Sequence, residues 1–311
     1  MRIVVLFSLI FLTALPTFAG DDNSHEVGIA IGAANFLGDL GGANKIGTPF
    51  LRDIEPKLFR PDINVFYRYN INLHFAAKAN VMFTRFIGND ALTTGEVFSD
   101  QWYRQIRNLS FKSYLLDFSG QLEMNFLKYQ PGDVDEHDWT PYVFLGVSGF
   151  WFNPTTEFQG ETVKLRPLGT EGQGMPGYGE KYKSISFAAL GGFGVKWNVS
   201  RRISMAWDLV YYQTFTDYID DVSTVYADPK DFIDFYGPTQ GAYIADLAER
   251  RDEIDPENNY GFVTAPTVQR GDPKDKDQFL TTNITLAFKL GDVGGYRGKG
   301  FKGGRMQCPK W

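Results

Sequence analysis

The sequence has 311 residues, a formal net charge of −6 and one cysteine, Cys308. The single cysteine excludes an intramolecular disulfide framework, and the acidic balance excludes the basic footprint of a nucleic-acid-binding protein. Aromatic residues make up 16% of the chain and glycines number 33, which favours a β-barrel with aromatic girdles.

The N-terminus has the pattern of a cleaved secretory signal. Arg2 precedes an apolar run from Ile3 to Leu15, and Thr17-Phe18-Ala19 is similar to a small-x-small cleavage site. We therefore expect residues 1–19 to be a signal peptide; an uncleaved N-terminal anchor is the alternative. The apolar run is too short to span a bilayer, and no later stretch reaches the roughly 18 apolar residues that a spanning helix needs.

Eight stretches of alternating side chains follow, and each is expected to form a strand. Long and short connections alternate between them, as they do in outer-membrane barrels, where periplasmic turns are short and extracellular loops are long. The sequence therefore predicts an eight-stranded antiparallel transmembrane β-barrel over residues 20–290, located in the outer membrane. A soluble β-sandwich is the alternative, but it would need polar residues on its outward face, whereas the polar residues of these strands lie on the inward face. The expected strands are 25–34, 62–70, 73–84, 113–126, 141–153, 184–197, 203–214 and 280–290.

One face of these strands would place charged side chains inside the barrel. An eight-stranded barrel is only wide enough for its own side chains to fill. We therefore expect the charges to pair with one another, because an unpaired buried charge is costly; an ion pathway is the alternative. His74 is expected in the same interior layer. The predicted network has four acids and four bases: Glu26, Arg68, Lys78, Asp117, Glu123, Lys196, Asp208 and Lys289.

The sequence carries no recognisable catalytic or metal motif. His25, His74 and His137 are the three histidines, and they lack metal-ligand spacing. Nucleophile-elbow, P-loop and zinc-helix motifs are missing. We therefore expect no enzymatic activity, cofactor, metal or small-molecule substrate. The turn Asp133–Asp138 could ligate calcium, but its spacing differs from an EF-hand loop, and a solvated acidic turn is the simpler interpretation.

The last long connection and the C-terminal tail have opposite charge. Residues 217–277 hold 15 acids and 6 bases, a net of −9, and are expected to form a solvated loop. The tail, residues 291–311, holds five bases and one acid. We interpret it as a basic periplasmic docking segment; a disordered end is the alternative. The candidate docking residues are Arg297, Lys299, Lys302, Arg305, Cys308 and Lys310.

Several segments resemble the PorG-like outer-membrane barrels of Bacteroidetes. The specific part is the third long connection, with Arg166–Gly174 and Pro176-Gly177-Tyr178, and the stretch Thr214–Thr224 after the seventh strand. His25–Gly28 and Asn153-Pro154 add to it. We expect the two loop motifs to be ordered. Their candidate residues are Arg166, Gly169, Glu171, Gly174, Asp217, Asp220 and Asp221.

The resemblance implies a non-enzymatic component of the type IX secretion system, which exports proteins across the outer membrane and supports gliding in some species. In that family the barrel is thought to anchor a periplasmic ring made of a lipoprotein and its partner protein. The expected partners are thus outer-membrane lipids and these ring proteins. A passive outer-membrane transport or binding barrel is the alternative, because a barrel fold alone says little about function.

Overall fold

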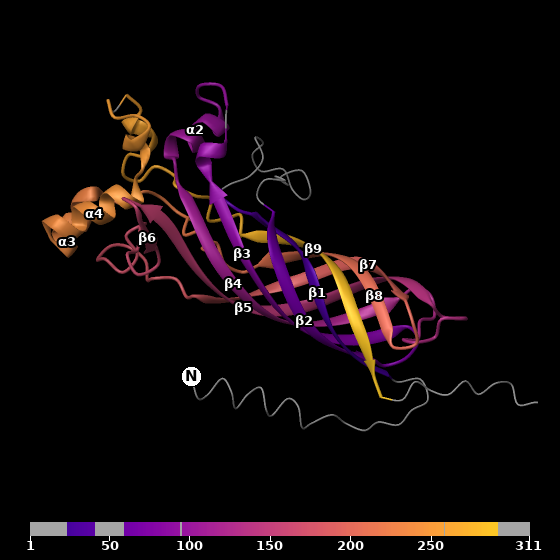
Figure 1. The fold of residues 1–311 in the computed structure, drawn as a ribbon. Helices are drawn as coiled ribbons and strands as arrows, with labels where there is room; N and C mark the ends of the chain where they lie inside the picture. The colour runs from indigo at the N-terminus through magenta and orange to yellow at the C-terminus, as the bar shows by residue number, and fades with distance from the viewer. Residues whose placement is uncertain (1–23, 41–58, 94, 258, 292–311) are drawn as a thin grey trace, which may run out of the picture.

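Strands account for most of the fold. The computed structural model describes residues 24–40, 59–93, 95–257 and 259–291, so the predicted signal peptide and the tail beyond Gly291 lie outside the described residues. Eight long strands form the body (Figure 1): β1 (Ser24–Leu37), β2 (Arg60–Asn70), β3 (Phe75–Asn89), β4 (Ser110–Asn125), β5 (Trp139–Phe158), β7 (Ile185–Asn198), β8 (Ile203–Thr214) and β9 (Gln278–Leu290).

The long strands form a closed antiparallel barrel. Each pairs with its neighbours in sequence, and β1 also pairs with β9, which closes the sheet on itself. On β1, Ile29 lies opposite Val65 of β2 and Leu286 of β9. The predicted eight-stranded antiparallel barrel is therefore confirmed. Figure 1 shows the long connections at one end, the long-loop end, and the short turns at the other, the short-turn end.

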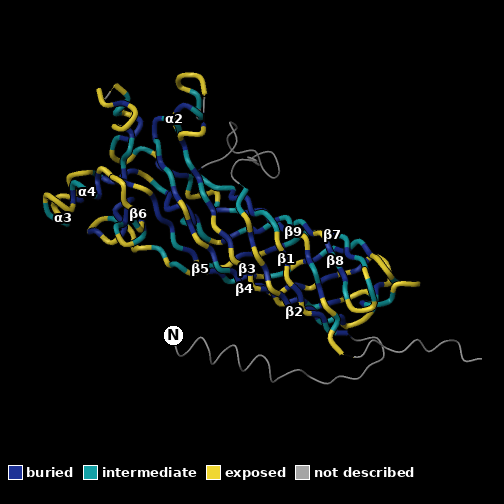
Figure 2. The backbone as a smooth tube through the Cα atoms, in the orientation of Figure 1, coloured by how far each residue is buried: buried dark blue, intermediate teal, exposed yellow. Residues whose placement is uncertain are grey.

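The outward face of the barrel is apolar. Side chains alternate between buried and exposed along the strands (Figure 2). Leu145 is 73% exposed, Leu122 is 68% exposed and Ile31 is 64% exposed, fractions that a water-soluble protein of this size would have to hide from solvent. An apolar band around a closed barrel is the surface that a lipid bilayer requires.

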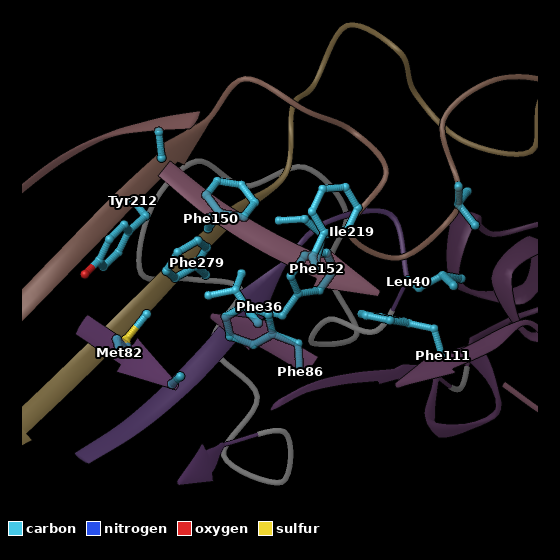
Figure 3. Close-up of a cluster of buried hydrophobic side chains, with 14 of the residues drawn as sticks. Phe36, Leu40, Met82, Phe86, Phe111, Phe150, Phe152, Tyr212, Ile219 and Phe279 are labelled. Atoms are coloured by element: carbon cyan, nitrogen blue, oxygen red, sulfur yellow. The ribbon is translucent and has the colours of Figure 1, made fainter. Parts of the chain in front are cut away.

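Aromatic side chains fill the interior of the barrel towards the long-loop end (Figure 3). Phe150 and Phe152, on the inward face of β5, are at most 1% exposed. Inward glycines leave room for such rings: a Cβ at Gly192 would lie 2.6 Å from Cζ of Phe144. The cluster includes Phe36, Met82, Phe86, Phe111, Phe150, Phe152, Tyr212, Ile219 and Phe279.

The long connections contain structure that the alternation of side chains does not predict. A short strand, β6 (Glu161–Lys164), pairs with the end of β5. Helix α2 (Asp100–Arg107) lies between β3 and β4, and α3 (Pro229–Tyr236) and α4 (Pro238–Ala248) lie between β8 and β9. In the described parts, no helix has the length and apolar character to cross a membrane. The expected solvated loop at 217–277 is thus a folded segment that contains two helices.

Within the described ranges, three short 3-10 turns accompany these helices: η3 (Asp90–Leu92), η4 (Arg251–Glu253) and η5 (Gly261–Val263). The local sequence explains where the helices start. The Ser99 side chain accepts the Trp102 amide and caps α2, and α3 and α4 each carry proline in the first turn, where a missing N–H costs nothing.

Candidate functional site

Four of the eight predicted interior charges form one buried network. Glu123 on β4 lies 3.0 Å from Nε of Arg68 and 2.8 Å from Nζ of Lys196. Arg68 also pairs with Glu26 at 3.3 Å. Glu26 accepts further hydrogen bonds from Asn70 at 3.1 Å and from a serine on β8 at 2.6 Å. Every member is at most 1% exposed, and the network crosses the interior, because Arg68 on β2 and Lys196 on β7 lie on opposite sides of the closed sheet.

The other four predicted charges lie outside this network. Lys78 holds its ammonium 5.0 Å from the centre of the Phe66 ring. Asp208 accepts from Tyr142 and Asn283, and Asp117 accepts from Ser148. Lys289 is half-buried near the end of its strand, where Nζ donates to the Pro131 carbonyl at 2.8 Å. None of the described cations forms an ion pair with Asp117 or Asp208. Neutral donors stabilise both carboxylates instead.

Asp62 is an interior acid that the sequence-based assignment missed. It is fully buried on β2 and accepts a hydrogen bond from Asn64 at 2.6 Å. Asn64 in turn contacts Asn283 and Asn80. With Asp62 inside and Lys289 only half-buried near the strand end, the inward strand faces that the structure describes hold five buried acids (Glu26, Asp62, Asp117, Glu123 and Asp208) and three buried bases (Arg68, Lys78 and Lys196). The expected equality of acids and bases is therefore wrong. Asp62 and Arg68 are separated by an even number of residues on one strand, so their side chains lie on the same face. This spacing could have placed Asp62 inside the barrel.

The histidines do not come together. His25 contacts Tyr67 on the strand face at 2.6 Å. His74 is exposed in the turn before β3, so its expected interior position is wrong; the strand begins two residues later than the alternation suggests. His137 contacts Asp133 at 2.9 Å within its own turn. Among the residues that the structure describes, no group of three or more His, Cys, Asp or Glu side chains is arranged to hold a metal ion.

At the long-loop end, the two motif segments meet. We call residues 165–183 and the described part of 215–277 the cap. Glu171 joins its halves: Oε1 accepts the amides of Ser223 at 2.8 Å and Thr224 at 3.1 Å, and Oε2 accepts the Thr224 hydroxyl at 2.7 Å. The Arg270 guanidinium pairs with Glu171 at 3.0 Å, and both side chains are buried. Glu171 therefore holds together two segments that are about 50 residues apart in sequence.

Asp221 forms a second junction in the cap. Its carboxylate accepts hydrogen bonds from Thr170 and Tyr182, each at 2.5 Å. Arg166 donates through Nε to the Tyr182 carbonyl at 2.6 Å. Gly169 has a φ of +68°, a left-handed conformation that favours glycine.

Gly174 likewise has a positive φ, +91°, and lies in the turn beside Lys181. Both glycines allow the third long connection to fold back on itself, which brings Glu171 and Thr170 to the neighbouring segment.

Asp217, Asp220 and Asp277 lie where the cap meets the barrel. Asp220 accepts the Leu40 amide at 2.9 Å and thereby ties the cap to the connection after β1. Asp277 accepts the Ile219 amide at 2.8 Å, and Asp217 accepts the Ser223 hydroxyl at 2.7 Å. Burial raises the pKa of Asp217 to about 7 and that of Asp221 to about 6, and it also raises the pKa of Asp220 and Asp277.

These raised pKa values predict that acid stabilises the cap. A carboxyl whose pKa is higher in the folded state binds more protons when folded, so its stabilising effect is lost as the pH rises through its folded-state pKa. Lowering the pH from about 8 to about 5 should raise the exchange protection of the Ile219 and Val222 amides by roughly tenfold or more, after correction for intrinsic rates. In Asp217→Asn this dependence should be flatter. Protection that decreases on acidification would contradict the prediction.

The candidate docking residues of the tail, Arg297, Lys299, Lys302, Arg305, Cys308 and Lys310, lie outside the described residues. Their docking role stays a prediction.

Comparisons with known proteins give one family model and several similar solved structures. A family model described as "Domain of unknown function (DUF6089)" matches residues 3–170. Among curated proteins, none matches this sequence. Similar solved structures include Ail of Yersinia pestis, at 8% identity over 86% of this chain and 98% of that chain, with a TM-score of 0.36. Another is OprG of Pseudomonas aeruginosa, at 9% identity over 87% and 96%, with a TM-score of 0.35.

Neisserial surface protein A is a third, at 10% identity over 87% of this chain and 100% of that chain, with a TM-score of 0.36. Similarities of this order show no shared activity.

Proposed function

The chain belongs to the DUF6089 family. From the resemblance of its loop segments to PorG-like barrels, we propose that it is a non-enzymatic outer-membrane barrel that anchors periplasmic components of the type IX secretion machinery. The apolar outward face supports a place in the outer membrane. The long-loop end is then extracellular, and the short-turn end, where β1 begins and β9 ends, is periplasmic. In this orientation the basic residues after Gly291 would continue into the periplasm.

The observation that carries the proposal is the filled interior. The Glu26–Arg68–Glu123–Lys196 network lies inside the barrel, and the aromatic cluster lies nearer the long-loop end. Opening a pore would require breaking buried ion pairs, which is costly. An anchor needs only a stable barrel with an accessible periplasmic end, so this interior favours an anchor over a passive transport barrel.

Removing the tail tests the anchoring role. Deletion of residues 292–311 should abolish most of the co-purification of periplasmic ring proteins, because the cluster of basic side chains that would contact them is lost, whereas the barrel should still assemble. Cross-linking of the intact chain in cells followed by mass spectrometry measures the loss. A matched control changes Arg201 and Arg202, which are exposed in a short turn, to glutamine.

Two results would contradict the proposal. Unchanged co-purification after the deletion would exclude docking through the tail. A steady conductance of the full chain in planar bilayers would show an open passage and favour the transport alternative.

A further inference from the structure

A cavity of about 570 Å³ lies at the long-loop end, apart from the interior network. Its walls come from α2, from the connection after β1 and from the connection between β8 and β9. The lining combines charged and apolar side chains: Asp39, Arg104, Arg107, Tyr226, Phe262, Val263, Val268, Arg270 and Asp272 are among them. The volume suits a small organic molecule.

Three residues of the cavity wall hold buried polar atoms that have no hydrogen-bond partner. They are Nη1 of Arg104, Nε of Arg270 and the hydroxyl of Tyr226. Guanidinium nitrogens only donate hydrogen bonds. Burial raises the pKa of Tyr226, so its hydroxyl stays protonated and can donate as well. Leaving buried donors unsatisfied costs about 1–3 kcal/mol each. Each donor has less than 1 Å² of accessible surface, so a ligand with acceptor oxygens would remove that cost after a small shift of the side chains that cover it.

The guanidinium groups are held in place by other contacts. Arg107 donates to both carboxylate oxygens of Asp90, at 2.7 and 2.9 Å, and to the Arg270 carbonyl at 2.5 Å. Arg270 is held through Nη1 by Glu171 at 3.0 Å and by the Asp221 carbonyl at 2.7 Å. These contacts leave Nε of Arg270 without an acceptor.

The carboxyl of Asp39 opposes a bound anion less than a fully solvated carboxylate would. Oδ2 of Asp39 accepts the Asp272 amide at 2.9 Å. Burial raises the pKa of Asp39, an effect that Arg107 partly offsets. Phe262, Val263 and Val268 supply an apolar wall beside the donors.

We propose that this cavity binds a small organic anion whose oxyanion head accepts hydrogen bonds from Arg104, Tyr226 and Arg270. The apolar part of the ligand lies against Phe262 and the two valines. This site is independent of the anchoring role, because it lies at the long-loop end, whereas β9, which the tail follows in sequence, ends at the short-turn end.

Phenyl phosphate titrated into the full-length protein in a non-ionic detergent tests the site by calorimetry. Saturable binding is expected, and Arg104→Gln should weaken it about tenfold or more through loss of a charge-assisted hydrogen bond. Arg201→Gln, which removes the same charge at the short-turn end, should leave it unchanged. Inorganic phosphate should bind more weakly, because it lacks the apolar part.

Tyr226→Phe keeps the test decisive if the arginine variant folds poorly. It removes only a hydroxyl without a partner, so the cap should remain folded while phenyl phosphate affinity decreases about threefold to tenfold. The proposal is overturned by absence of saturable binding, by equal binding of neutral benzyl alcohol, or by unchanged affinity in both variants.

Discussion

Replacing Glu123 by glutamine is expected to lower the free energy of unfolding of the barrel by about 3–5 kcal/mol. Glu123 is the only residue of the network that contacts both Arg68 and Lys196 among the described ion pairs. Glutamine keeps the shape of the side chain but removes its charge. Arg68 would keep Glu26, whereas Lys196 would be left buried without a carboxylate, a loss that the nearby Tyr142 ring at 4.6 Å offsets only in part.

Urea titration of the refolded protein in lipid vesicles measures this loss, with unfolding followed by tryptophan fluorescence. Glu157→Gln is the matched control: Glu157 pairs with Lys112 at 3.1 Å, but both side chains are about half exposed. An exposed pair contributes about 0–1 kcal/mol, so the control should be close to wild type. Equal effects of the two substitutions would show that the interior network does not stabilise the barrel.

The barrel could be predicted from the sequence because each strand alternates between lipid and a filled interior. That pattern depends on neighbours two positions apart, as with Val27, Ile29 and Ile31 on β1, which are all exposed. The interior partners were harder to predict, since which charges meet depends on register across the barrel. Parity places Lys289 inward opposite Glu26, yet its amine reaches a turn carbonyl near the strand end.

The contacts within the cap could not be predicted from the sequence. The motif segments around Glu171 and Asp221 were singled out, but a contact such as Thr170 to Asp221 spans 51 residues and depends on how both loops fold. The helices of the connections had local signals, such as Ser99 before α2 and Pro229 at the start of α3. The net negative charge of residues 217–277 favoured a solvated loop in the sequence-based prediction. Charged residues indicate exposure to solvent, but they do not exclude a helix.

Replacing Glu171 by alanine is expected to release the two halves of the cap while the barrel stays closed. The substitution removes the acceptor for the amides of Ser223 and Thr224 and leaves the buried Arg270 without its carboxylate. Loss of a buried ion pair with its hydrogen bonds costs about 3 kcal/mol or more. Because local opening sets amide exchange, protection of the Ser223 and Thr224 amides should decrease by about a hundredfold.

Hydrogen exchange followed by mass spectrometry separates the cap from the barrel, since strand amides such as those of β8 should keep their protection. Glu161→Ala is the matched control, because Glu161 is an exposed acid of the same connection, on β6, where surface substitutions change stability by about 0.5 kcal/mol or less. Arg270 also lines the proposed anion cavity. Glu171→Ala should therefore weaken phenyl phosphate binding as well, although Glu171 is not among the residues lining that cavity. Exchange in the cap that is the same in both variants would mean that Glu171 does not hold the cap together.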